Sequence, residues 1–386
     1  MKWLRLLLSV AREAITNRDA ALLFFGAIAF YSFFYAWPYE NQLVRNVPVV
    51  IADLDGSAAS RRLIREIGAT PAVKVVGVEA SQSRAQAALQ TERAAVILIV
   101  PANFEHDLLA GRDTVLAALG DGAYPVKVRA ALAGVAGPLT VAATAAAAKQ
   151  MARAGIPLPV LERAALAGPA VTVQPMINLV PGYAVYAVPL VSVVILQAIM
   201  LMGITLALGG WLATEARPQH LEHALESPGT LAALVGGFAL ITFFWALYLE
   251  GFAFWWHDFP TLVKLPATLL VTVPLSLSIA ALGVALALAL GSGGYAMQVV
   301  VVSSVPAVFL SGAIYPWQNM PAWVQAIANL FPSTPGIHGM LLASQMGAPI
   351  SAVMGPALHL MALALAYFAI AAWLARRHRM EPVPAA

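Results

Sequence analysis

The sequence predicts an α-helical integral membrane protein with six transmembrane helices and an external α/β domain inserted between the first and second spans. Of the 386 residues, 60% are hydrophobic and only 11% are charged, whereas soluble domains carry roughly 25% charged residues. The mean hydropathy is +0.78, and several apolar runs reach the length of about 18 residues that a membrane-crossing helix needs. Charged residues return between residues 40 and 178, where strand and helix patterns alternate.

Residues 1–38 are predicted to form an amphipathic helix followed by the first span. In residues 1–19, apolar residues recur at helical spacing around Lys2, Arg5, Arg12 and Arg18, which is typical of a helix on the cytoplasmic membrane surface. Residues 20–37 are uncharged and rich in Phe and Tyr. A cleaved signal peptide is the alternative, but the apolar run is long and no small-x-small site precedes Pro38. A retained span would place the following residues outside the cytoplasm.

Residues 39–178 are predicted to form the external, periplasmic α/β domain. Strand patterns cover residues 47–55, 73–79, 94–100 and 114–119, and helix patterns cover residues 57–69, 81–93 and 103–110. Strands that alternate with helices indicate a small buried sheet. Residues 125–153 are Ala-rich and favour one long helix of this domain. A membrane span is the alternative, although Gly134, Gly137 and Pro138 interrupt its middle.

Residues 179–386 are predicted to form a membrane domain of five spans. Hydropathy places these spans at residues 183–212, 231–249, 266–290, 298–314 and 353–374. Arg376, Arg377 and Arg379 follow the last span at once. With six spans in total, both basic ends lie in the cytoplasm, as the excess of positive charge on that side requires. Trp245, Tyr248, Trp255 and Trp256 would then form an outer aromatic belt.

Isolated ionisable residues in or near the spans are functional candidates, because such groups are costly in lipid. Glu250 and Lys264 fall near predicted span ends, where snorkelling to the interface suffices. For His359 we favour a neutral ring that is hydrogen-bonded across helices, and His338 lies in the outer loop. The spans offer almost no buried carboxylate for a proton-coupled carrier.

One polar stretch, residues 213–228, interrupts the apolar C-terminal half. Four of the seven Asp, Glu, Lys and Arg residues between Leu179 and Ala375 lie here: Glu215, Arg217, Glu222 and Glu226. A polar helix between two spans must lie at the water boundary, where a soluble partner could move the spans. A solvated loop without a partner is the alternative. His220 and His223 lack a third ligand and the H-E-x-x-H spacing of a zinc site, so we expect no metal here.

The strongest enzyme-like motif is Asp53-Leu54-Asp55-Gly56-Ser57 at the end of an apolar strand. It resembles the nucleophile loop of haloacid-dehalogenase-type phosphatases, in which the first Asp attacks phosphorus. Those enzymes also need a later Lys and an acidic pair for magnesium, and no such acidic cluster follows here. We favour the structural interpretation: the motif ends a strand, turns the chain and caps a helix.

Other function classes are excluded by what the sequence lacks. No G-x-x-x-x-G-K-[ST] motif is present, so the chain should not hydrolyse ATP by itself and should bind no cofactor. The absence of cysteine excludes disulfides, thiolate catalysis and cysteine metal sites. The net charge of +3 is concentrated at the two ends, a pattern that fits membrane orientation and not nucleic-acid binding.

Residues 309–335, FLSGAIYPWQNMPAWVQAIANLFPSTP, are the most distinctive stretch. A span is expected to end at Tyr315-Pro316, and a short amphipathic helix over residues 322–330 should lie in the outer interface until Pro332 stops it. A surface helix without a role in transport is the alternative. Together with two other stretches, this segment resembles the permease subunits of the type-2 ABC exporter family, which includes bacterial multidrug exporters.

The resemblance extends over nearly the whole chain. The outer segment is similar to the family signature L-S-G-x-x-Y-P-x-x-N-M-P…P-x-T through Leu310, Ser311, Gly312, Tyr315, Pro316, Asn319, Met320, Pro321, Pro332 and Thr334. Residues 46–63 resemble the start of the family's external domain. Residues 214–228 match the cytoplasmic family segment in part, through Glu215, Glu222, Leu225, Ser227 and Pro228. Pro218-Gln219-His220 replaces the family's Gly-Thr turn.

The resemblance implies a transporter in the bacterial inner membrane, with both termini in the cytoplasm. Two permease subunits, as two copies or as paralogues, would join two ATPase subunits that hold ATP and Mg²⁺. The apolar and aromatic faces of the spans suggest a hydrophobic or amphipathic cargo. Membrane lipids would surround the spans, and the external domain would contact a periplasmic adaptor protein. The resemblance assigns ATPase coupling to Glu215, Arg217, Glu222, His223 and Glu226. It implies that residues 309–335 contain re-entrant helices that help to close the exit, and it assigns this outer gate to Ser311, Gly312, Tyr315, Pro316, Asn319, Pro321 and Pro332.

Two functions of other classes remain as alternatives. A membrane sensor would use residues 40–178 as its ligand domain, but the chain has no cytoplasmic output domain. A membrane-bound phosphatase would use Asp53 and Asp55. The sequence leaves open which cargo, which ATPase and which adaptor are involved, and which residues line the pathway.

Overall fold

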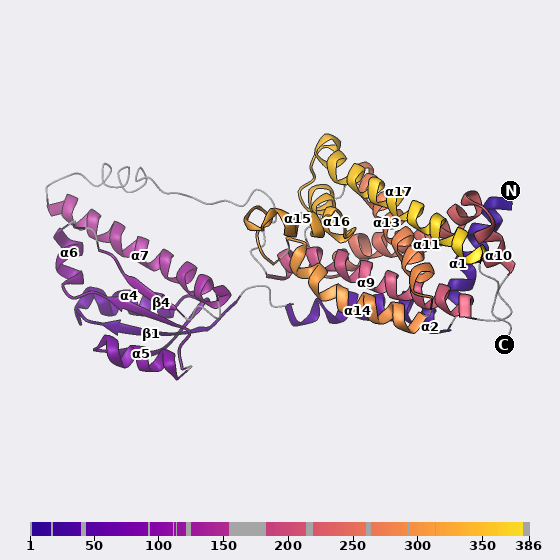
Figure 1. Cartoon of the computed structure of the whole chain (residues 1–386). Helices are drawn as coiled ribbons and strands as arrows, with labels where there is room; N and C mark the ends of the chain where they lie inside the picture. The colour runs from indigo at the N-terminus through magenta and orange to yellow at the C-terminus, as the bar shows by residue number, and fades with distance from the viewer. Residues whose placement is uncertain are drawn as a thin grey trace. The chain divides into compact units, whose positions relative to one another are not determined.

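The computed structural model describes residues 2–16, 18–39, 44–91, 93–110, 112, 114–120, 125–153, 183–213, 219–259, 264–291, 293–312 and 314–380. The chain divides into two compact units. One unit, the helical unit, consists of Met1–Gln42 and Pro175–Ala386, and the other, the α/β unit, consists of Leu43–Gln174. Figure 1 shows the α/β unit in purple and magenta. Each unit is described by itself.

The α/β unit is built on a four-stranded sheet. Its strands are β1 (Val47–Asp53), β2 (Val73–Glu79), β3 (Val96–Val100) and β4 (Ala117–Gly120). Their order is β2-β1-β3-β4. β1 is parallel to both β2 and β3, whereas β3 and β4 are antiparallel. The two central strands, β1 and β3, are almost completely buried, which agrees with their uninterrupted apolar sequences.

Helices cover both faces of this sheet (Figure 1). They are α4 (Ala58–Gly68), α5 (Gln82–Gln90), α6 (Phe104–Ala110) and α7 (Pro125–Arg153). Val49 and Ile51 of β1 pack with α4, α6 and α7 on one face. Val50 and Ala52 pack with α5 on the other, because successive side chains of a strand point to opposite faces. The parallel strands are joined through α4 and α5, which supply the crossover connections that parallel pairing needs.

The helical unit begins with short helices and continues with long apolar ones. Its first elements are α1 (Lys2–Thr16), α2 (Arg18–Ala21), the π-helical turn η1 (Leu22–Ala27), α3 (Ile28–Phe34) and the 3-10 turn η2 (Trp37–Tyr39). Next come α9 (Tyr183–Ala213), α10 (Gln219–Glu226), α11 (Pro228–Leu247), the π-helical turn η3 (Tyr248–Ala253) and α12 (Phe254–Trp256).

The remaining elements of the helical unit include its central helix, α13. They are α13 (Leu265–Leu290), α14 (Gly293–Leu310), the 3-10 turn η4 (Trp317–Asn319), α15 (Ala322–Ala328), α16 (Ser333–Met340), the π-helical turn η5 (Leu341–Gln345) and α17 (Ile350–Met380). α13 packs against α9, α11 and α17. Its residues Val271, Ile279 and Val284 are completely buried, so the core of this unit lies along α13.

Five described helices are long and apolar enough to cross a membrane. They are Val126–Lys149, Ala187–Leu212, Pro228–Trp256, Leu265–Leu290 and Ile350–Arg377. This set differs from the six predicted spans. α7 is one of the five candidate spans, although its residues Ala131 and Val135 pack on the sheet of the α/β unit. The predicted span at residues 20–37 is interrupted by η1, and the span at 298–314 is a shorter helix that ends at Leu310. The six-span topology therefore stays a prediction.

Candidate functional site

The phosphatase-like loop of the α/β unit has a structural role. The carboxylate of Asp53 accepts hydrogen bonds from the backbone N–H groups of Asp55 (3.2 Å) and Gly56 (2.9 Å), and from the Ser60 hydroxyl (2.9 Å). Ser57 caps α4 by accepting a bond from the Ser60 N–H. The motif thus ends β1, turns the chain and starts a helix, as its residue types predict.

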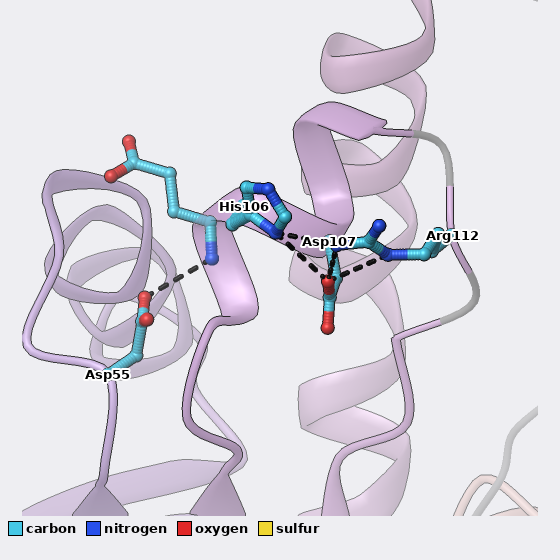
Figure 2. Close-up of polar contacts among 5 residues, drawn as sticks. Asp55, His106, Asp107 and Arg112 are labelled. Carbon is cyan, nitrogen blue, oxygen red and sulfur yellow. Dashed lines mark hydrogen bonds and ion pairs between the residues drawn. The ribbon is translucent and has the colours of Figure 1, made fainter.

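Asp55 is also used by the fold, as an acceptor at the start of a second helix, α6. Its carboxylate accepts a hydrogen bond from the backbone N–H of Glu105, at the start of α6 (3.2 Å; Figure 2). An acceptor is favourable there, because the first N–H groups of a helix lack partners within the helix. Within the described part of the chain, no group of three or more His, Asp or Glu residues could hold a metal ion.

A second polar cluster closes the other end of α6 (Figure 2). Arg112 donates through Nε to the Asp107 carboxylate (2.8 Å), and its backbone N–H donates to the Asp107 carbonyl (2.9 Å). Hydrogen bonding from Arg112 is the main cause that lowers the pKa of Asp107, and His106 adds to it. The group is exposed to solvent, so we interpret it as the end of a helix and not as a reactive site.

The predicted coupling residues lie on or near α10 of the helical unit. Glu222, His223 and Glu226 are exposed, whereas Leu225 is buried. α10 packs against α11 and also contacts α1 and α17. The helix α10 therefore buries the side of Leu225 against its neighbours and exposes the acidic side, with Glu222 and Glu226, to solvent. Glu215 and Arg217 lie outside the described residues.

The junction between α10 and α11 is fixed by a capping box. Ser227 accepts a hydrogen bond from the Thr230 N–H (3.2 Å), and the Thr230 hydroxyl accepts one from the Ser227 N–H (3.0 Å). Pro228 follows in the first turn of α11, where a missing N–H costs nothing. Ser227 and Pro228, which the family resemblance singled out, thus set the direction in which the chain leaves α10.

The N-terminal helix α1 packs closely on α11. Val10 and Ala14 of α1 are completely buried. A Cβ atom at Gly237 of α11 would lie 2.9 Å from both the Leu7 carbonyl oxygen and the Val10 side chain. The surface helix expected from the sequence is therefore also part of the bundle. We call α1 and α10, packed together on α11, the α1–α10 group. Figure 1 shows both helices at the same end of the helical unit.

The predicted outer segment combines exposed and buried residues. Tyr315, Pro316, Asn319 and Pro321 are exposed, whereas Ser311 and Pro332 are buried. α14 ends at Leu310, earlier than the predicted end at Tyr315-Pro316. Gly312 then adopts a positive φ of 82°, a conformation that favours glycine, and its backbone passes close to Trp317.

Contacts of three further side chains shape the outer segment. The side chain of Gln325 donates to the carbonyl oxygens of Trp317 (3.1 Å) and Met320 (3.0 Å), so α15 holds the preceding turn. His359 of α17 makes a hydrogen bond with the Asn329 carbonyl (3.0 Å), which is a bond across helices of the kind that the sequence favours for this residue. The ring of His338 contacts the ring of Trp317 edge to face, at 5.4 Å between centroids.

The structure corrects the expectation that the chain beyond Pro332 is an outer loop. α16 starts at Ser333, and nearly all of its residues are buried against α9, α13 and α17. A Cβ atom at Gly336 would lie 2.9 Å from Leu275, and one at Gly339 would lie 2.8 Å from Val271. The two glycines thus let α16 approach α13 closely. Their spacing in an uncharged stretch was the signal that could have revealed this buried helix.

Glu250 corrects a second expectation, because it does not snorkel. Its side chain is 6% exposed and accepts a hydrogen bond from the hydroxyl of Ser344, which is 1% exposed (2.8 Å). Glu250 lies in η3 and Ser344 in η5, and π-helical turns of this kind are frequent at functional sites. α11, α13 and η5 contain no charged residue, so these neighbouring elements offer the carboxyl no ion-pair partner. Lys264 is exposed, and its ammonium donates to the Gly347 carbonyl.

Residues 21–373 match a family model that is described as ABC-2 family transporter protein. The match spans both the α/β unit and the long helices of the helical unit, including α10 and the outer segment. A comparison with curated proteins gives no match to the chain.

Proposed function

The chain belongs to the ABC-2 family of transporter proteins, and we propose that it is the permease subunit of an ATP-driven exporter. As a family member it is a multi-pass membrane component of an ABC transporter and not itself the enzyme. In our proposal two such subunits, two copies of this chain or this chain with a paralogue, form the pathway for a hydrophobic or amphipathic cargo. ATP and Mg²⁺ are held by a separate ATPase subunit, and this chain binds no cofactor.

The observation that carries the proposal is the α1–α10 group. α10 is a short polar helix between the long apolar helices α9 and α11, and it presents Glu222 and Glu226 at its surface. A soluble ATPase that binds this group would act on α11 directly, because both α1 and α10 are packed on that helix. Charge complementarity favours a basic surface on the ATPase.

Coupling requires an element with two arrangements that both ends can bias. We propose that the packed helices around α13 are this element. A push on the α1–α10 group would tilt α11, and α11 packs on α13. α13 in turn packs on α16, which follows the outer segment. Movement of the outer segment, with its signature residues between Ser311 and Pro332, would then release the cargo outwards.

The topology completes the proposal. We place the α1–α10 group and both termini in the cytoplasm, and the α/β unit outside the inner membrane of a bacterium. The exposed aromatic residues Trp255 and Trp256 support a position of α12 at a membrane interface, because tryptophan favours that depth, and the proposed orientation makes it the outer one. The α/β unit would be available to a periplasmic adaptor protein, and multidrug efflux is the cargo class that the family resemblance suggests.

Affinity purification of the tagged chain from its native membrane tests the proposal. We expect a P-loop ATPase to copurify in stoichiometric amount. Replacing Glu222 and Glu226 together by Lys should reduce its yield at least about tenfold, since close charge pairs at interfaces contribute several kcal/mol.

Glu79→Lys, on β2 of the α/β unit, is the matched control and should leave the ATPase yield unchanged. An ATPase that copurifies equally with the Glu222/Glu226 variant would contradict the assigned contact. The absence of any ATPase under mild detergent conditions would contradict the exporter proposal and favour a sensor.

A further inference from the structure

A pocket of about 310 Å³ lies inside the helical unit, among α9, α13, α14, α15 and α17. Its lining includes Val194, Gln197, Leu282, Val299, Leu330 and Tyr367. None of its lining residues is charged. Its volume is in the range of pockets that bind small molecules.

The polar wall of the pocket contains a hydrogen-bond donor without an acceptor. Gln197 is 3% exposed, and its Oε1 atom accepts a hydrogen bond from the Ser333 N–H (2.6 Å). Its Nε2 group donates to no atom of the described residues, although it lies in a wall of the pocket. An acceptor atom of a bound molecule would satisfy it.

Part of the pocket lining belongs to the outer segment. Ile327 lies on α15, and Leu330 and Phe331 follow it. Tyr367 of α17 donates a hydrogen bond to the Leu330 carbonyl, and the Gln197–Ser333 bond holds the start of α16. Two polar side chains of the pocket wall therefore hold the residues of the outer segment that line it. Movement of the outer segment would change the shape of the pocket as well.

We propose that this pocket binds an uncharged, largely apolar molecule through an acceptor oxygen that meets Gln197 Nε2. The inference rests on the proposed export function, because it identifies such molecules as the cargo class. A charged ligand is excluded, since the lining contains no charge to pair with it and burial of an unpaired charge is very costly. Because the lining comes from one chain, each permease subunit has its own site.

Binding of the uncharged naphthalene ketone prodan to the purified chain in lipid nanodiscs tests this proposal. The emission wavelength of prodan reports its transfer from water to an apolar site. Its carbonyl oxygen supplies the acceptor for Gln197 Nε2. After subtraction of empty nanodiscs, we expect saturable binding. Val299→Trp, which fills the pocket, should weaken binding at least about tenfold, because a packed site does not accept extra volume.

Val302→Trp is the matched control. Val302 lies on the same helix, is 74% exposed and does not line the pocket, so this variant should bind prodan as the wild type does. Gln197→Met keeps the side-chain length but removes both the amide donor and the acceptor of the Ser333 N–H, so it should weaken binding at least about fivefold, the loss expected for the hydrogen bond to the ligand alone. Equal binding by the two Trp variants, or binding that does not saturate, would overturn the proposal.

The measurement needs neither ATP nor the ATPase, so its failure is distinct from failure of the proposed function. Copurification of an ATPase without saturable prodan binding would overturn the pocket assignment and leave the exporter function intact. Saturable binding that Val299→Trp abolishes supports the pocket assignment whether or not an ATPase copurifies.

Discussion

At the scale of single residues, burial decides what a polar side chain can do. Asp53 and Glu250 are both carboxylates near the end of an apolar segment, yet their environments differ. Asp53 accepts three hydrogen bonds from the loop that follows it and from α4, so it forms part of a turn. Glu250 accepts a bond from Ser344, which lies 94 residues further along the chain. Its environment therefore depends on how the helices pack.

The Glu250–Ser344 pair gives a prediction about stability. Ser344→Ala removes the donor and leaves the buried carboxyl without it, which should lower the free energy of unfolding by about 1–3 kcal/mol. Replacing both partners, as Glu250→Leu with Ser344→Ala, should recover much of this loss, because no polar group is then left unpaired. Thermal or SDS unfolding of the purified chain measures both changes.

Ser303→Ala serves as the control, since the Ser303 hydroxyl bonds only to a carbonyl of its own helix. If Ser344→Ala is as stable as Ser303→Ala, the pair does not stabilise the packing of η3 against η5.

At the scale of elements, close packing of helices depends on small residues. α1 lies against α11 at Gly237, and α16 lies against α13 at Gly336 and Gly339. In both places a methyl group would meet a neighbour at less than 3.0 Å. These contacts connect elements that are far apart in the sequence, and they give the bundle the rigid connections that our coupling proposal needs.

Gly237→Ala tests the packing of α1 on α11. The new methyl group would meet the Leu7 carbonyl oxygen at 2.9 Å, and backbone cannot move away as easily as a side chain. We expect a loss of about 1–3 kcal/mol of stability, typical of overpacking, together with faster proteolysis of α1.

Gly210→Ala is the matched control, because it lies in α9 and a Cβ atom there meets nothing within 4 Å. It should be neutral or stabilising by up to about 1 kcal/mol, since alanine favours helix more than glycine does. Equal stability of the two variants would show that α1 does not depend on this contact.

At the scale of the whole molecule, the topology depends on whether α7 crosses the membrane. α7 has the length and composition of a span, yet only 17% of its apolar window is buried in the molecule, and part of that burial is against a sheet. Length and composition do not distinguish a lipid-facing helix from an exposed Ala-rich one.

The native chain has no cysteine, so single cysteines can report the topology without background. Val115→Cys and Lys149→Cys, before α7 and near its end, should both react with a membrane-impermeant maleimide added outside intact cells. Glu222→Cys on α10 should react only after permeabilisation. Reaction of Val115→Cys and Lys149→Cys from opposite sides would show that α7 crosses the membrane and would contradict an external α/β unit.

The sequence by itself determined the features that depend on local pattern. Apolar runs and the low share of charged residues indicated a membrane protein, and strands that alternate with helices predicted the α/β unit. The turn residues of the Asp53 loop, together with the missing acidic cluster, predicted a structural role for it. The polar stretch around Glu222 and the outer signature were the two segments through which the sequence resembled the family. Each of these features is set by residues within about one or two turns or strands of each other.

The contacts between distant helices were visible only in the folded chain. Folding buries α16 within the bundle, pairs Glu250 with Ser344, packs α1 on α11 and forms the pocket beside Gln197. The sequence could not predict these contacts, because an apolar or small residue in a membrane helix is equally compatible with lipid and with a neighbouring helix. Which of the two surrounds it depends on segments that lie tens to hundreds of residues away.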